Sequence, residues 1–240
     1  MAALDPMVEQ LLEEGVQAVE SLPSHATRIS QLLSTHFPPQ TLEAVHGAMR
    51  PSVAAGSVNT KVAELCSLAR EEAAVAGAQF RAIEMWLRLK APAVSDGNNF
   101  GVEIQNYVFE ELSKMRTAME AMSTVGKDYY WSRAEGLAKV TGEDKATTTI
   151  TEDKELKEGK EETTKKNSSV TTKSTPKPLP DYQEYVVCVD VRQYHLVFNH
   201  LTDMRNNYIK AHVLFAKNMK KLNDPRGDGE GKTANVMSMF

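Results

Sequence analysis

Residues 57–90 hold the longest uninterrupted helical pattern in this 240-residue sequence. Apolar side chains recur there at alternating steps of three and four residues, and the segment contains no proline. This spacing puts a single apolar stripe on one helix face. The stripe comprises Val62, Leu65, Ala69, Ala73, Ala76, Phe80, Ile83 and Leu87. At about 1.5 Å per residue such a helix is about 50 Å long, so it needs partner helices of similar length.

Three other segments have the same periodicity, over residues 7–36, 100–140 and 181–224. In the first we expect Val8, Leu11, Leu12, Val16, Val19 and Leu22 to share one face. Pro23 is expected to interrupt this helix, with Ser21 or Ser24 capping the restart. A short helix is predicted over 41–49, followed by a connection over 50–56.

The other two segments are predicted to be helical throughout. Residues 100–140 carry Ile104, Val108, Leu112, Met115, Met119 and Met122, followed by Tyr129, Tyr130 and Trp131. Residues 185–189 are β-branched and locally strand-like, but the helical spacing from Val197 to Leu222 favours a helix.

Four long helices joined by tight turns predict an all-α fold, an up-down-up-down four-helix bundle. We expect residues 1–240 to form a single domain. In this topology the 91–101 loop and the tail over 225–240 lie at one end. The 50–57 connection and residues 141–180 lie at the other. Residues 141–180 are rich in Thr, Ser, Lys and Glu, and we predict that they are disordered.

Composition narrows the class of protein. The hydrophobic content of 41% and charged content of 25% are typical of a soluble globular chain. There is neither an apolar run that could span a bilayer nor a signal peptide, so we expect a cytoplasmic or nuclear protein without a membrane partner. The net charge of −4 argues against nucleic-acid binding. Cys66 and Cys188 are expected to be free, buried thiols.

The sequence contains no motif typical of an enzyme. No phosphate-binding loop or dinucleotide fingerprint is present. The six histidines form no metal-binding pattern, and His195 and His200 diverge on a helix. No pattern pairs a nucleophilic side chain with a general base. We therefore expect a binding protein that needs neither metal nor cofactor.

The loop over Ser95-Asp96-Gly97-Asn98-Asn99-Phe100-Gly101 concentrates conformationally demanding residues. Pro92 ends the preceding helix, and Gly and Asn accept positive φ angles at little cost. One interpretation is an ordinary turn between helices. The other is a loop held in one shape, which is a common position for function.

Three blocks of this sequence resemble the 11S (REG) family of proteasome activators. The first runs from Trp86-Leu87 through Leu89 and Pro92 into Asp96 to Val102, then Gln105 and Val108-Phe109-Glu110. The second is Met204-Arg205-Asn206-Asn207-Tyr208, followed by Lys217-Asn218 and Lys221-Leu222. The third is Pro225-Arg226-Gly227, which leads to a short apolar C-terminus.

The resemblance implies a ring, usually of seven subunits, made of this chain or of paralogous chains. Such a ring caps the 20S proteasome without using ATP. It implies that C-terminal tails insert between the proteasome α subunits, here through Val236, Met237, Ser238, Met239 and Phe240. It also implies that an activation loop opens the gate of the α ring, with Asn98 as the main contact. That loop comprises Pro92, Ser95, Asp96, Gly97, Asn98, Asn99, Phe100 and Gly101.

Two features depart from the family pattern. The low-complexity segment lies between the third and fourth helices instead of the first and second, and the penultimate residue is Met239 instead of tyrosine. The alternative function is a helical scaffold or a lipid-binding bundle, which would tolerate any flexible linker over 95–101.

Overall fold

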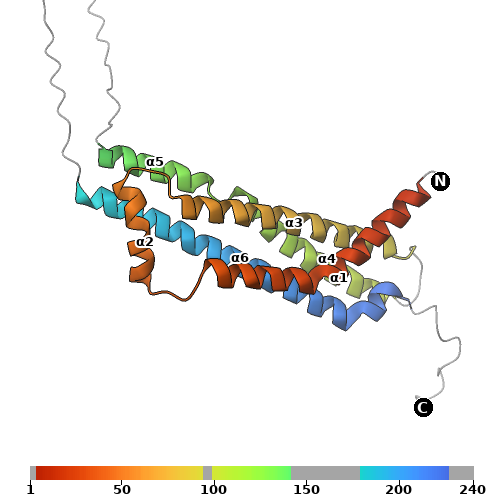
Figure 1. Ribbon diagram of the computed structural model, residues 1–240. Coiled ribbons are helices and arrows are strands. Elements are labelled where there is room, and N and C mark those ends of the chain that lie inside the picture. Colours follow the sequence, from red (N-terminus) through yellow and green to blue (C-terminus); the bar gives the residue numbers. More distant parts are fainter. Residues whose placement is uncertain (1–3, 94–98, 142–178, 227–240) are drawn as a thin grey trace, which may run out of the picture.

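The computed structural model describes residues 4–93, 99–141 and 179–226. Within these ranges the chain forms helices and no strand (Figure 1). The elements are α1 (Asp5–His36), α2 (Leu42–Ala54), α3 (Thr60–Lys90), α4 (Phe100–Ala121), the 3₁₀ helix η1 (Met122–Thr124), α5 (Lys127–Thr141) and α6 (Pro180–Asn223). In the described part of the chain no helix is long and apolar enough to cross a membrane.

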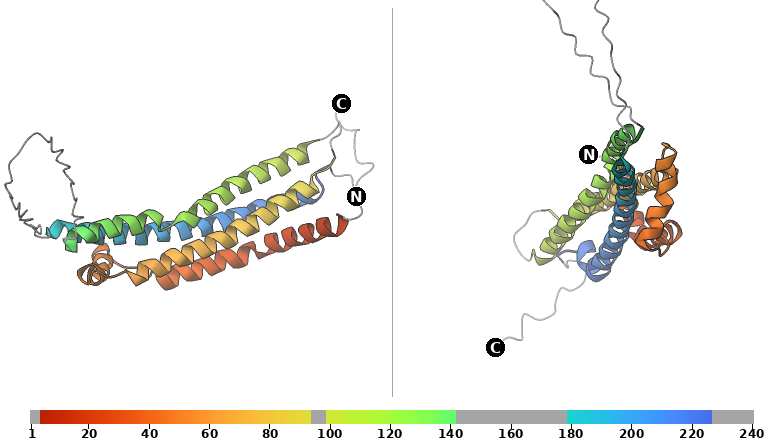
Figure 2. Two further views of the ribbon diagram at one scale, coloured as in Figure 1. Left: turned by 90° about the horizontal axis from the view of Figure 1, so that it is seen from above. Right: turned by 90° about the vertical axis from the view of Figure 1, so that its left-hand side faces the viewer.

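The long helices run side by side in alternating directions, as Figure 2 shows from two further sides. α1 packs against α3 and α6, and α4 packs against the same two helices. α5 continues the direction of α4 and packs against α6. The predicted all-α, up-down-up-down bundle is therefore confirmed.

The predicted apolar stripe of α3 forms the centre of the core. All eight of its side chains are buried, with at most 2% of their surface exposed. Asn59 caps the start of this helix, because its side-chain oxygen accepts a hydrogen bond of 3.2 Å from the Val62 N–H. The long helices α1, α4 and α6 all pack against α3.

The expectation that Pro23 interrupts the first helix is wrong, because α1 continues through it. The Ser21 and Ser24 hydroxyls do not cap a restart. They donate to the carbonyls of Ala18 and Ser21 at 2.9 and 2.7 Å. A proline inside a helix removes one backbone hydrogen bond and favours a bend, and Figure 1 shows α1 bending along its length.

The face predicted for the first half of α1 is confirmed only in part, because Leu12 and Val19 pack against the core but Val8 and Val16 do not. Of that stripe only Leu22 is fully buried, whereas Val8 and Val16 are exposed by 37% and 41%. The buried face instead includes Gly15, where an added Cβ would lie 2.3 Å from the Cβ of Trp86. A small residue there lets α1 approach α3 more closely than the larger apolar residues would.

α2 extends further than its predicted boundary at residue 49. Thr41 caps its start by accepting a 3.2 Å bond from the Ala44 N–H. The helix continues past Pro51 to Ala54, with Val53 buried in the core. Most of the predicted 50–56 connection is therefore helical, and the backbone leaves the helix at Gly56, whose φ is +62°.

The third predicted helix is broken where we expected continuity over 100–140. α4 ends at Ala121, η1 follows, and Gly126 adopts a φ of +98°, which side chains other than glycine rarely tolerate. After the break Tyr129 is buried, while Tyr130 and Trp131 are exposed.

The strand-like residues 185–189 are helical, as the downstream spacing predicted. Val186 and Val187 are buried, and Val186 packs directly on Gly136 of α5. Cys66 is buried as expected, but Cys188 is exposed, which corrects the expectation of two buried thiols. Its neighbours in sequence face α5 and the core, which turns residue 188 outward.

Candidate functional site

The connection between α3 and α4 lies at the same end of the bundle as the C-terminal end of α6 (Figure 1). Of the predicted activation loop, the structure describes Pro92, Asn99, Phe100 and Gly101. Ser95, Asp96, Gly97 and Asn98 lie outside the described residues, and so do the tail residues Val236, Met237, Ser238, Met239 and Phe240. The geometry of this end is therefore that of the loop's two flanks and of the segment that leads to the tail.

The start of α4 is in close contact with the end of α6. A Cβ added to Gly101 would lie 1.8 Å from the carbonyl oxygen of Pro225, which no side chain can occupy. Glycine is thus required here for a close backbone approach. Gly101 fixes the first turn of α4 against Pro225, the first residue of the segment 225–240.

The other flank of the loop is attached to the same segment. The Arg226 guanidinium donates a 2.7 Å hydrogen bond from Nη2 to the carbonyl oxygen of Ala93. Pro225 and Arg226 therefore contact the chain on both sides of the loop, through Gly101 and Ala93. A displacement of Pro225 and Arg226 would therefore change the contacts at both ends of the loop.

Gln105 connects the three helix ends from inside the bundle. Its side chain is buried, and Nε2 donates to the carbonyl oxygen of Leu222 at 2.9 Å and more weakly to that of Lys90 at 3.5 Å. The last residues of a helix leave carbonyl oxygens without intrahelical partners. Gln105 satisfies these carbonyls and thereby holds the ends of α3 and α6 beside α4.

The aromatic residues next to the loop stiffen the same end. Trp86 is buried and packs against Phe215 of α6, with ring centroids 6.1 Å apart. The Arg88 guanidinium lies over the Phe109 ring at 3.7 Å, which is cation–π geometry. Several residues of the first resemblance block therefore position the loop from within, whereas Phe100 is 60% exposed beside it.

Residues 204–208, the second block that resembles the family, mostly contribute to packing of the bundle. Met204 and Tyr208 are buried, and the Tyr208 hydroxyl donates a 2.6 Å hydrogen bond to Gln79 Oε1 of α3. Burial, together with the nearby charge of Glu72, raises the pKa of Tyr208. The Arg205 guanidinium donates to the neighbouring Asn206 side chain.

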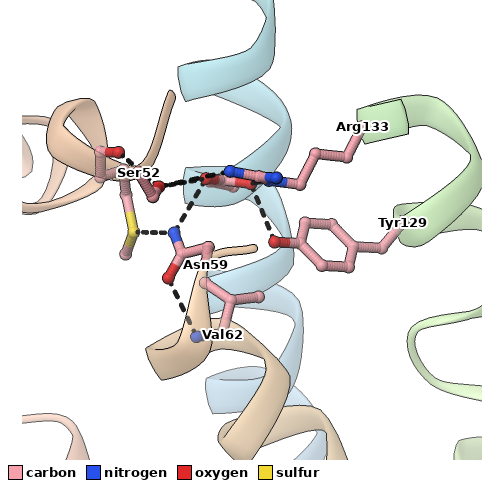
Figure 3. A network of polar contacts seen from close by, with 7 residues as sticks. Ser52, Asn59, Val62, Tyr129 and Arg133 are labelled. Carbon is pink, nitrogen blue, oxygen red and sulfur yellow. Dashed lines mark hydrogen bonds and ion pairs between the residues drawn. The ribbon is translucent and has the colours of Figure 1, made fainter. Parts of the chain in front are cut away.

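A buried polar network at the opposite end of the bundle was not anticipated from the sequence (Figure 3). Asp190 of α6 is fully buried and accepts hydrogen bonds from Tyr129 Oη at 2.9 Å, Arg133 Nε at 2.8 Å and Asn59 Nδ2 at 2.8 Å. Ser52 of α2 lies at 3.5 Å from the same carboxylate. The network joins α2, α3, α5 and α6 at one point.

The network contains a buried ion pair. Arg133 is itself only 6% exposed and forms the ion pair with Asp190. Burial raises the pKa of the Tyr129 phenol, and the Asp190 charge and hydrogen bond raise it further. Tyr129 therefore stays a neutral donor. The only sequence signal for this network was a lone aspartate inside an apolar stretch, 186–191.

The described part of the chain contains no group of three or more His, Cys, Asp or Glu residues placed to hold a metal ion. The two ends of the bundle therefore differ in kind. One end presents a loop between firmly held flanks. The other is closed by α2 and the Asp190 network, with Arg50 of α2 paired to Glu184 of α6.

Solved structures with a similar fold include proteasome activators. The 11S subunit of the Plasmodium falciparum proteasome, PA28, superimposes with a TM-score of 0.64 at 18% identity, over 93% of this chain and 92% of that one. The activator of a proteasome–11S activator complex gives a TM-score of 0.64 at 11% identity, over 96% and 99% of the two chains.

Sequence comparison leads to the same group of proteins. Proteasome activator complex subunit 3 from human and from chicken is 24% identical over 144 residues, which is 60% of this chain and 44% of either relative. The chain thus spans less than half the length of the curated relatives it matches. The family model of the C-terminal region of proteasome activator PA28 matches residues 56–148 and 151–232, which is most of the chain. The chain therefore belongs to the PA28, or 11S, family of proteasome activators.

Proposed function

We propose that this protein is an ATP-independent activator of the 20S proteasome that assembles into a ring, usually of seven subunits, of itself or of paralogous chains. The observation that carries the proposal is the attachment of both loop flanks to the end of α6, through Gly101 and Arg226. Family membership supports it, as does the likeness to a structure of an archaeal 20S proteasome in complex with a mutated P26 activator, with a TM-score of 0.62.

In this proposal the tail and the loop have separate tasks. The tail residues Val236 to Phe240 bind between proteasome α subunits and supply affinity. The loop, Pro92 and Ser95 to Gly101, then contacts the gate of the α ring, with Asn98 as the main contact. Because Gln105 and Pro225 hold the loop's flanks against the helix that leads into the tail, docking of the tail sets the position of the loop.

The protein acts as a regulator instead of an enzyme in this scheme. The energy for gate opening comes from binding alone, since a contact that is stronger in the open state shifts the gate equilibrium without ATP. Short peptides can then enter, whereas folded proteins cannot, because nothing in the scheme unfolds them. We place this activity in the cytoplasm, the nucleus or both.

The test is to mix purified protein with latent 20S proteasome and follow hydrolysis of short fluorogenic peptides without nucleotide. We expect faster hydrolysis of the peptides and no change for a folded or ubiquitinated protein. A variant with the tail residues Met239 and Phe240 removed serves as the matched control for docking.

Two results would contradict the proposal. One is stimulation that requires ATP. The other is an assembled ring that neither binds the 20S proteasome nor changes its peptidase rate, which would favour the alternative of a helical scaffold or lipid-binding bundle.

A further inference from the structure

The outward face of α1 near its N-terminus is acidic. Residues 5–27 contain five Asp or Glu residues and no Lys or Arg. Glu9, Glu13, Val16 and Glu20 recur at steps of three and four, which places them on one exposed face of the helix. Val16, exposed by 41%, adds a branched apolar side chain to this face.

The outward face of α6 near its C-terminus has the opposite charge. Residues 204–226 contain six Lys or Arg residues and one acidic residue, Asp224. Ile209, Val213, Lys217 and Lys220 follow one another at helical spacing and are all exposed. Ile209 and Val213 are exposed by 46% and 40%, so this face too combines charge with apolar surface.

The two faces lie at the same height along the bundle. Gly15 of α1 is against Trp86 of α3, and Trp86 packs against Phe215 of α6. Residues 15, 86 and 215 therefore mark one level near the loop-bearing end. Among the described residues no ion pair joins the acidic face of α1 to the basic face of α6 within one chain.

Equal height matters because subunits of a closed ring are related by rotation without translation. A head-to-tail contact in such a ring joins two different faces, and both must lie at one level. Complementary charge at that level orients the approach and disfavours the wrong pairing, while the apolar residues between the charges bury surface.

We infer that the acidic face of α1 binds the basic face of α6 of a second copy of this chain. The two surfaces, Glu13–Glu20 of one subunit and Ile209–Lys220 of the next, then form the two opposing sides of each subunit contact and set the direction in which the ring closes. The inference rests on the proposed ring and names its contact surfaces.

The test is a charge swap followed by sedimentation velocity of the chain alone, at micromolar concentration. Lys217→Glu with Lys220→Glu should weaken self-association about tenfold or more, since acidic faces would then oppose each other. Glu13→Lys with Glu20→Lys should do the same. All four substitutions in one chain should restore the oligomer, because the paired faces are complementary again.

Added salt provides a second readout. It should partly restore association of each double variant, because screening weakens repulsion between exposed like charges. The control is Lys127→Glu with Arg192→Glu, which makes the same change in net charge on exposed residues elsewhere and should leave the oligomer intact. Far-UV circular dichroism checks folding, and Lys217→Gln with Lys220→Gln replaces the double variant if it does not fold.

The inference is overturned if the unmodified chain stays monomeric, if the double variants keep its oligomeric mass, or if the fourfold swap fails to restore it. Because no proteasome is present in this experiment, its result is separate from that of the peptidase test. Restored assembly without stimulation would contradict the proposed function alone, and stimulation with no effect of the swap would contradict the inference alone.

Discussion

At the scale of single residues, Asp190 has the strongest expected effect on stability. Asp190→Ala leaves Arg133 with an unpaired charge in a site where its side chain is 6% exposed. Removing one partner of a buried ion pair costs about 3–5 kcal/mol. We expect a loss of that size in the free energy of unfolding, measured by urea denaturation.

The control is Arg50→Ala at the same end of the bundle. Arg50 and Glu184 form an ion pair whose side chains are 56% and 50% exposed, so its loss should cost less than about 1 kcal/mol. Equal losses for the two variants would show that the Asp190 network is not the main contact at this end.

Gly101 gives a second prediction at this scale. In Gly101→Ala the new methyl group would overlap the Pro225 carbonyl oxygen, so α4 must move away from the end of α6, at a cost of about 1–3 kcal/mol. We expect weaker stimulation of peptide hydrolysis, with proteasome binding retained because the tail is unchanged.

Gly47→Ala is the matched control for this substitution. Gly47 also lies in a helix, α2, but an added Cβ would meet nothing within 4 Å. It should raise stability by up to about 1 kcal/mol and leave stimulation unchanged. Unimpaired stimulation by Gly101→Ala would mean that the α4–α6 contact does not position the loop.

At the scale of elements, the connection between α5 and α6 is expected to be dispensable. Lys139 of α5 lies 5.7 Å from the Tyr182 ring of α6, so the two helices meet beside this connection. Deleting 143–176 leaves Gly142 and residues 177–179 to join them. We predict that ring assembly, measured by sedimentation, and peptide stimulation stay nearly unchanged.

The reason is both compositional and geometric. Residues 141–180 offer little apolar surface to bury. The ends of α5 and α6 that they join lie at the opposite end of the bundle from the end of α3 and the start of α4 (Figure 1). Loss of the oligomer on deletion would show instead that this segment packs against the bundle or a neighbouring subunit.

At the scale of the whole assembly, gate opening and affinity should be separable. Asn98→Tyr places a bulky side chain in the predicted activation loop, and we expect the helices to be undisturbed. We expect it to bind the proteasome, fail to stimulate peptide hydrolysis, and compete with the unmodified protein. The measurements are the affinity for the 20S proteasome and the peptidase rate.

Removing Met239 and Phe240 should have the opposite effect. A ring presents several tails at once, and such multivalency can strengthen binding by about 10²–10⁴. Weakening every copy together should abolish binding, with stimulation partly recovered at high concentration. If Asn98→Tyr loses binding as completely as this truncation, the loop and the tail do not have separate roles.

The sequence by itself determined the helices and their order, because their signals are local. The seam from Val62 to Leu87 repeats every three to four residues, and only a long buried helix satisfies that pattern. The up-down-up-down topology predicted from four such helices placed the loop flanks at the same end as the C-terminus of α6. The family resemblance likewise lay in contiguous residues around the loop.

Tertiary structure decided whatever depends on contacts between distant residues. No local signal shows that Gly15 lets α1 approach Trp86, and so the exposed side of α1 was misjudged in part. Pro23 was expected to interrupt α1, and residues 50–56 were expected to be a connection, but the helices continue through Pro23 and Pro51 because packing outweighs the one hydrogen bond that each proline removes. The helix break at η1 and Gly126 has no signal in the apolar spacing either.

The same reason explains the polar contacts. The carboxylate of Asp190 accepts its hydrogen bonds from Arg133, Tyr129 and Asn59, which are 57, 61 and 131 residues away in sequence. Gln105 reaches the end of α6 across 117 residues. Buried polar groups need partners of the right geometry, wherever in the chain those partners come from. Only the assembled bundle brings them within hydrogen-bonding distance.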